Sequence, residues 1–280
     1  MALPEASRAV SVQELETLLY EDVPFGDLTT EALALGDVHA RMELRARSGM
    51  VVALAEEASA LIRMTGGEPS VAVKSGSGVM AGALIVSATG PAGALLKSWK
   101  VAQTLMECWS GVATATRDIV TAARSASPNI VIACTRKNIP GTRRFAAAAV
   151  LAGGGTMHRL GLSETILVFP EHLTLLGTEP LNETVARLRR AAPEKKLVIE
   201  VTSVVEGVAA AEAGFDVVQT EKFLPDEIAR LTAALRDLPR RPVIAAAGGI
   251  TAANAAEIAR AGADVLVTSR RTQRRLAILQ

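Results

Sequence analysis

The sequence predicts a two-part α/β protein, in which an α+β unit up to about residue 110 precedes parallel βα units that suit a barrel. Two observations support this prediction. Residues 38–47 alternate strictly between apolar and polar, as in a half-buried strand of an antiparallel sheet. After Gly111, short apolar runs alternate with amphipathic helices, which is typical of parallel strands covered on both faces. A chain of 280 residues, 49% of them hydrophobic, can bury a core in each part.

The first part is expected to begin with a helix. Ser11 and Glu14 form a capping box, which predicts a helix through about Tyr20. In the alternating strand the apolar side chains face one way, namely Val38, Ala40, Met42, Leu44 and Ala46. Further strands are expected near residues 50–53, 70–74 and 84–88, with a helix over 56–64. A long helical pattern over 94–109 connects the two parts.

The second part repeats one pattern along about 160 residues. Buried parallel strands are predicted at 130–133, 165–169, 197–201, 217–219, 243–246 and 265–268. Amphipathic helices are predicted at 203–213, 225–235 and 251–261, the last with Thr251 as N-cap and Gly262 at its end. Six or seven such units suit a complete or incomplete barrel, and a doubly wound sheet is the alternative.

Composition excludes several classes of protein. The hydrophobic content excludes a disordered chain, and 3% aromatic residues argue against a base-stacking nucleic-acid surface. Because 30 Lys and Arg balance 29 Asp and Glu, any anion-binding site must be local. No apolar run reaches the roughly 18 residues of a membrane span, and the segment before Val10 lacks the apolar stretch of a signal peptide. We therefore expect a cytoplasmic protein without a membrane or nucleic-acid partner.

Charged and small residues follow the predicted strands. The carboxyl ends of barrel strands carry the chemistry of most barrel enzymes. The residues expected there are Arg136, Lys137, Glu200, Glu221 with Lys222, Gly248, Gly249 and Ser269. A second cationic cluster, His158 and Arg159, follows three glycines. Core packing alone gives no reason for these charges, so the sequence predicts a pocket for a small anionic molecule.

Each group in this set has a structural alternative. Gly248 and Gly249 precede a predicted helix and can hold a phosphate with Ser269, or they can form a simple tight turn. Glu200 and Glu221 can hold a divalent cation, or each can pair with a nearby lysine. His158 is either a ligand-contacting donor or a structural histidine.

Ordered motifs along nearly the whole chain resemble the quinolinate phosphoribosyltransferase (nicotinate-nucleotide pyrophosphorylase) family. They are Glu21-Asp22 with Gly26-Asp27-Leu28-Thr29-Thr30, Ser110-Gly111, Thr135-Arg136-Lys137, Pro140-Gly141, Gly153-Gly154-Gly155, His158-Arg159, Ile199-Glu200-Val201 and Gly248-Gly249-Ile250. The segments 99–103, 167–172 and 245–249 resemble the ModD branch of that family, whose genes tend to accompany molybdate transport.

This resemblance implies an architecture. It consists of an N-terminal α/β sandwich over 1–110, an open α/β barrel over 111–270 and a basic tail over 271–280. It also implies a homodimer, or a larger oligomer, in which each sandwich covers the barrel mouth of its partner.

The resemblance also implies roles for individual residues. The acceptor pocket would be lined by Lys100, Arg136, Lys137, His158 and Arg159, with Lys137 also near the ribose diphosphate. Glu200 would contact the ribose or Mg²⁺, and Glu221 stands where the family has aspartate. The catalytic set would be Lys137, Glu200 and Glu221, and the 5′-phosphate would lie on Gly248, Gly249 and Ser269.

The chain departs from the family pattern on the acceptor side. Lys100 replaces an acceptor-binding arginine and so lacks the two-pronged grip on a carboxylate. Phe169 stands in place of a lysine, and Thr104 in place of an asparagine. A glutamate and a serine have become Ala245 and Ala247. The polarity of the acceptor side is reduced more than that of the phosphate side.

The resulting hypothesis is a Mg²⁺-dependent phosphoribosyltransferase, linked to molybdenum metabolism, whose acidic heterocyclic acceptor is not quinolinate. One rival on the same fold is a lyase or isomerase in which Lys137 forms a Schiff base. A second rival is a non-catalytic module that binds a nucleotide or oxyanion. Borohydride trapping would identify the lyase, and ligand binding without turnover would identify the module.

Overall fold

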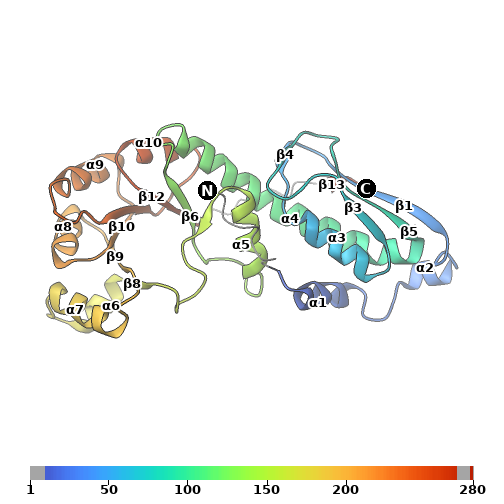
Figure 1. Cartoon of the computed structure of the whole chain (residues 1–280), viewed down its shortest axis with the longest axis horizontal. Coiled ribbons are helices and arrows are strands. Elements are labelled where there is room, and N and C mark those ends of the chain that lie inside the picture. The colour runs from blue at the N-terminus through green and yellow to red at the C-terminus, as the bar shows by residue number, and fades with distance from the viewer. Residues whose placement is uncertain (1–9, 270–277, 280) are drawn as a thin grey trace. The chain divides into compact units, whose positions relative to one another are not determined.

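The computed structural model describes residues 10–269 and 278–279, which form two compact units (Figure 1). The first unit contains the chain up to Arg117, residues 139–154 and the last strand. The second contains residues 118–138 and 155–270. Of the expected basic tail over 271–280, residues 271–277 and 280 lie outside the described part of the chain.

The first unit is built on an antiparallel sheet covered by helices. The sheet has the order β13-β1-β5-β3, with bounds Ile278–Leu279, His39–Ala46, Leu84–Pro91 and Glu68–Val71. A two-stranded ribbon pairs β2 (Met50–Val51) with β4 (Gly78–Val79). The helices are α1 (Val12–Asp22), α2 (Leu28–Ala32), α3 (Ala55–Met64), α5 (Arg143–Ala152) and most of α4 (Ala92–Arg124).

Local patterns in this unit fold as predicted. The Ser11 hydroxyl accepts a hydrogen bond from Glu14 N–H at 3.3 Å, and Glu14 Oε2 accepts one from Ser11 N–H at 2.8 Å, which confirms the capping box. In β1, Leu44 and Ala46 are fully buried, whereas Arg41 and the other polar side chains face outward. The alternation therefore predicted both the strand and its buried face.

Helix α4 is longer than the sequence pattern indicated. The helical pattern was expected to end at residue 109, but α4 continues to Arg124. The buried Ser110 hydroxyl accepts a hydrogen bond from Ala53 N–H at 2.9 Å, and Thr114 Oγ1 accepts one from Val51 N–H at the same distance. These hydroxyls satisfy backbone groups around β2, so polar residues that look like a break in the sequence are inside the helix.

The second unit is an open barrel. Its strands are β6 (Val131–Cys134), β7 (Thr156–Met157), β8 (Ile166–Val168), β9 (Leu197–Val201), β10 (Val217–Glu221), β11 (Val243–Ala247) and β12 (Val265–Thr268). They are parallel and lie in the order β7-β6-β12-β11-β10-β9-β8. Along the chain, β6 is the first of these strands and β12 is the last. These two strands pair with one another, which excludes the doubly wound alternative. No ladder joins β7 to β8 in the described chain, so the predicted open α/β barrel is confirmed.

The two faces of this sheet differ in side-chain size. On the outer face, Ile132, Ile199, Val218 and Leu266 pack in one core with helices α7 (Leu181–Ala191), α8 (Val204–Ala213), α9 (Pro225–Ala234) and α10 (Ala255–Arg260). The inner face carries a separate cluster of small side chains, formed by Ala133, Ala245, Ala247 and Val267. Because neighbouring residues of a strand point to opposite faces, the barrel interior is lined by small residues.

Two aspartates connect neighbouring strands at the amino-terminal edge of the sheet. Asp216 precedes β10 and accepts a hydrogen bond from Leu197 N–H, at the start of β9, at 2.8 Å. Asp264 precedes β12 and accepts one from Ile244 N–H, in β11, at 2.8 Å. Arg241 pairs with Asp264 at 2.9 Å. Each carboxylate therefore fixes the register of a strand with its neighbour.

Asp216 is the more deeply buried of the two, with a side chain only 2% exposed. Arg189 and Arg240 bind its carboxylate at 2.8 and 2.7 Å, and Lys196 lies at 3.7 Å. Burial acts to raise the pKa of Asp216, but the Leu197 hydrogen bond and the Arg189 and Lys196 charges outweigh it, so the pKa is lowered. Arg189 and Lys196 are thus partners of a buried carboxylate.

Asp216→Asn should destabilise the protein at pH 7 by about 3 kcal/mol, because three cations lose their buried partner. Because the folded-state pKa is the lower one, the carboxylate contributes stability above the unfolded-state pKa of about 3.9 and loses it as pH falls through the folded-state pKa. Urea unfolding of both proteins should show this difference shrinking at acidic pH. Asp264→Asn, at a half-exposed pair, is the control and should cost only about 1 kcal/mol. Equal effects of the two substitutions would contradict this account.

Candidate active site

The carboxyl-terminal edge of the barrel sheet gathers nine of the residues predicted to form the site. Backbone pairing continues just past the strands: Thr135 N–H donates to Thr268 O at 2.9 Å, and His158 N–H donates to Cys134 O at 2.8 Å. Lys222 N–H likewise donates to Ala247 O at 2.8 Å. The residues that stand along this edge are Arg136, Lys137, His158, Arg159, Glu200, Glu221, Gly248, Gly249 and Ser269.

The cationic side of the edge centres on a buried arginine. Arg159 is only 7% exposed, and no carboxylate of the described chain forms an ion pair with it. Burial and then the charge of Arg136 lower its pKa. Burial and the Arg159 charge also lower the pKa of His158, which favours the neutral imidazole at pH 7. A buried guanidinium that has no carboxylate partner among the described residues, with a second guanidinium nearby, is suited to bind an anion.

An aromatic pair borders this cation. Phe169 precedes α6 (Pro170–Leu176), and its ring centroid lies 5.8 Å from Arg159 Cζ. The His172 ring stacks on Phe169 with centroids 5.9 Å apart, and His172 Nδ1 accepts a hydrogen bond from Phe169 N–H at 2.9 Å. Phe169 is half-buried and belongs to none of the hydrophobic clusters. It therefore faces the cationic group and not the core.

The acidic side of the edge consists of Glu200 and Glu221. Burial raises the pKa of Glu200; a hydrogen bond from Gln219 opposes this, Glu221 and Glu171 raise the pKa further, and Lys137 lowers it. These charges therefore lie within electrostatic reach of one another. Within the described residues no group of three or more His, Cys, Asp or Glu side chains is placed to hold a metal ion. A cation at Glu200 and Glu221 would thus need further oxygen ligands from a substrate or water.

Lys222 was recognised as a strand-end cation but was not assigned a role from the sequence. Its backbone is left-handed, with φ of +60°, which is unfavourable for a residue with a side chain. Its Nζ lies 3.9 Å from Glu221 Oε1. A Cβ at Gly248 would come 2.6 Å from Lys222 Cγ and 2.7 Å from Lys222 N. Gly248 must therefore be glycine for Lys222 to lie against it.

The predicted phosphate loop has the expected glycines but a later helix. Gly248 and Gly249 both have positive φ, and a Cβ at Gly249 would meet nothing within 4 Å, so its backbone is accessible. The helix was expected to begin after Thr251, and this is wrong: α10 begins at Ala255. Asn254 Oδ1 accepts a hydrogen bond from Thr251 N–H at 2.8 Å, and this turn delays the helix. Across the edge, Thr135 Oγ1 donates to Ser269 Oγ at 3.0 Å.

Lys100 lies in the first unit, on α4. Its Nζ stands 4.0 Å from the centroid of the Trp99 ring and 3.5 Å from Gln103 Oε1. The side chain is exposed, and these contacts are local to the helix. Its assignment to the acceptor pocket therefore rests on the family resemblance alone.

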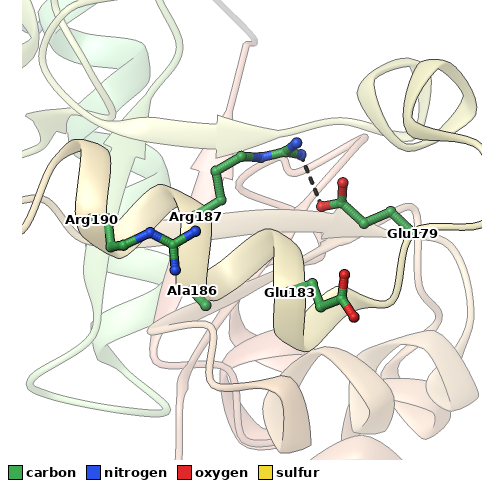
Figure 2. Close-up of a pocket in the computed structure, with 5 residues that line it drawn as sticks. All are labelled: Glu179, Glu183, Ala186, Arg187 and Arg190. Atoms are coloured by element: carbon green, nitrogen blue, oxygen red, sulfur yellow. Dashed lines mark hydrogen bonds and ion pairs between the residues drawn. The ribbon is translucent and has the colours of Figure 1, made fainter.

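A second concave surface, on the helical layer, is unrelated to the strand ends. It is lined by Glu179, Glu183, Ala186, Arg187 and Arg190 (Figure 2). Arg187 Nη2 pairs with Glu179 Oε1 at 2.9 Å, and the same oxygen accepts a hydrogen bond from Thr184 Oγ1 at 2.8 Å. These contacts organise the start of α7, and none of the predicted site residues takes part.

Comparison with known families agrees with this arrangement. Residues 27–110 match the N-terminal domain of quinolinate phosphoribosyl transferase, and residues 112–278 match its C-terminal domain. The chain belongs to the quinolinate phosphoribosyl transferase family. Phosphoribosyl transferases are pentosyltransferases, so the expected enzyme class is confirmed along with the family.

Similar proteins occur within this family. A Rhodobacter capsulatus protein named "Putative pyrophosphorylase ModD" is 47% identical over 89% of this chain and 95% of its own length. A Methanothermobacter thermautotrophicus protein named as a nicotinate-nucleotide pyrophosphorylase is 31% identical over 90% of this chain and 91% of its own. The crystal structure of NadC from Streptococcus pyogenes is 25% identical, with a TM-score of 0.87 over 95% of this chain and 93% of that one.

Sequence reasoning did not select two residues that lie close to the candidate site. Gln219 lies on the inner face between Glu200 and Glu221, and its signal was a polar side chain inside the apolar strand β10. His172 appeared in the sequence only as part of a motif, because its stacking on Phe169 depends on how the chain turns into α6.

Among the described residues, none of the helices has both the length and the apolar character that a membrane span requires.

Proposed function

We propose that this chain transfers a phosphoribosyl group between a ribose diphosphate and an acidic heterocyclic acceptor other than quinolinate, with Mg²⁺ as cofactor. The observation that carries the proposal is the buried Arg159, which has no carboxylate partner in the described chain and lies on the same edge as Glu200 and Glu221. A cationic side suits the acidic acceptor, and the neighbouring carboxylate pair suits the pentose of the donor together with Mg²⁺. The proposed link to molybdenum metabolism rests on the similarity to proteins named ModD, because the genes of that branch tend to accompany molybdate transport.

For the acceptor, we assign Arg136, Lys137, His158 and Arg159 to the pocket that binds its carboxylate. Arg159 is already desolvated, so a carboxylate that reaches it gains a strong charge-assisted hydrogen bond. Neutral His158 can donate a hydrogen bond without adding charge. These contacts would hold the acceptor nitrogen in line with the anomeric carbon.

For the donor, we assign the 5′-phosphate to Gly248, Gly249 and Ser269, and the pentose to Glu200 and Glu221. Carboxylates beside the sugar stabilise the positive charge that develops on the ring when the bond to diphosphate breaks. Lys137 supplies a positive charge for the departing diphosphate. Two carboxylates suit Mg²⁺ when diphosphate oxygens complete its shell, and the ion would neutralise the leaving group.

Gly249→Asp should weaken binding of phosphoribosyl diphosphate at least tenfold, because a carboxylate then occupies the accessible space at Gly249. Gly249→Ala is the matched control: at positive φ it carries a backbone penalty of about 1 kcal/mol, at least as large as that of Asp, but adds no charge. Calorimetry with and without Mg²⁺ measures both affinities. Equal affinity of the Asp and Ala variants would refute the phosphate assignment, and no donor binding by the native protein would refute the function.

Phe169 supports an acceptor with less negative charge than quinolinate. A second carboxylate placed on the Phe169 ring would lose its hydration without gaining a donor, at a cost of several kcal/mol. The native protein should therefore turn over quinolinate slowly, and Phe169→Lys should raise that rate tenfold or more. Phe169→Leu, which adds no charge, should not. Native turnover of quinolinate on the order of 1 per second or faster would be an ordinary enzyme rate and would contradict this.

We also propose a homodimer with composite sites. The N-terminal segment of the first unit exposes large apolar side chains: Phe25 is 94% exposed, Leu28 81% and Tyr20 67%. Such a surface favours burial against another chain. The exposed Lys100 would then enter the acceptor pocket of the partner.

In such a dimer, Lys100→Ala and Lys137→Ala subunits should each be inactive alone but complement one another when mixed. Half of randomly mixed dimers carry both subunit types, and each of those has one intact site, so about a quarter of native activity should return. Subunits that are unmixed or covalently crosslinked before mixing are the control. A monomer in solution scattering with full ligand binding would contradict the composite site.

A further inference from the structure

Gln219 presents a buried hydrogen-bond acceptor that nothing in the described chain satisfies. The residue is only 4% exposed and lies at the centre of β10. Its Nε2 donates to Glu200 Oε2 at 2.7 Å, across the ladder position where Gln219 and Glu200 are partners. Its Oε1 is buried and accepts no hydrogen bond from the described residues. An unsatisfied buried acceptor costs free energy, so it calls for an explanation.

The chemistry of Glu200 determines which way the amide of Gln219 faces. An ionised carboxylate can only accept hydrogen bonds, so the NH₂ group of the amide must face Glu200. The carbonyl oxygen is then directed away from Glu200. Gln219 and Glu200 face the barrel interior, where the neighbouring side chains include the small Ala245 and Ala247. Gln219 Oε1 and the Glu200 carboxylate therefore lie side by side on the inner face, where a ligand bound inside the barrel would contact both.

The group that satisfies Gln219 Oε1 must be a hydrogen-bond donor. Phosphate and carboxylate oxygens only accept, so neither a diphosphate nor an acidic group of the acceptor suits it. The hydroxyls of a pentose are donors and stand on adjacent carbons, which matches two neighbouring acceptors on adjacent strands. We propose that Gln219 is a sugar-binding residue, whose Oε1 accepts from one ring hydroxyl of the pentose while its Nε2 positions Glu200 for the other. This inference rests on the proposed function, because it names a contact to the donor.

Gln219→Met tests the contact, since it keeps an unbranched side chain of similar length and removes the amide. The native protein should bind ribose 5-phosphate about tenfold more tightly than either 2-deoxyribose 5-phosphate or 3-deoxyribose 5-phosphate. In Gln219→Met the preference should disappear for one of these two analogues and remain for the other. Calorimetry with the three sugar phosphates measures all the affinities.

Thr220→Val is the matched control. Thr220 is the next residue of β10, is fully buried and also carries an unsatisfied oxygen, but it faces the opposite side of the sheet. It should leave every sugar affinity unchanged. The hydroxyl preference is also the readout that a merely structural role of Gln219 would not move, because a loss of packing weakens binding of all three sugar phosphates alike.

The outcomes separate this inference from the proposed function. Native protein that binds ribose 5-phosphate, with the same hydroxyl preference in Gln219→Met, overturns the Gln219 assignment and leaves the function standing. Native protein that binds neither ribose 5-phosphate nor phosphoribosyl diphosphate overturns both. If Gln219→Met does not fold, Gln219→Asn retracts the oxygen by one methylene and should show the same loss of preference.

Discussion

The parallel backbone register of the seven barrel strands is the constraint on which the candidate site depends. Because the strands run in one direction, their amino ends share one edge and their carboxyl ends share the other. Asp216 and Asp264 fix this register at the amino edge. The register then brings Glu200 opposite Gln219 and Glu221 opposite Ala247, although long helices separate them in the chain. The edge that stabilises the sheet is thus separate from the edge that carries the candidate site.

The two edges of the sheet differ in whether their buried charged and polar groups have partners in the described chain. At the amino edge the buried Asp216 is neutralised by arginines and a lysine, and its pKa is lowered. At the carboxyl edge, no described residue pairs a carboxylate with the buried Arg159 or donates a hydrogen bond to Gln219 Oε1, and the pKa of Glu200 is raised. Each of these groups costs stability in the free protein and would be satisfied by a bound molecule. This contrast supports a binding site at one edge only.

Sequence reasoning predicted most strands and the order of the site residues, but its errors share a cause. Helix α4 continues past residue 109 because Ser110 and Thr114 bond to backbone of another element. Helix α10 starts late because Asn254 forms a local turn with Thr251. In both cases one polar side chain has two plausible partners, and local pattern does not choose between them. Gln219 was missed for the same reason, since its partner Glu200 lies on a neighbouring strand.

By itself, the sequence determined the alternating βα units and the charged residues at the strand ends, because strand periodicity is a local property of the chain. The order of its motifs indicated the family and, through that resemblance, the open α/β barrel. Only the tertiary structure decided that Phe169 faces Arg159. It also decided that Lys222 lies against Gly248 and that Gln219 donates a hydrogen bond to Glu200. Those relations depend on which strands are neighbours and on the loops between them. Contacts between residues far apart in the chain arise from packing, which periodicity does not encode.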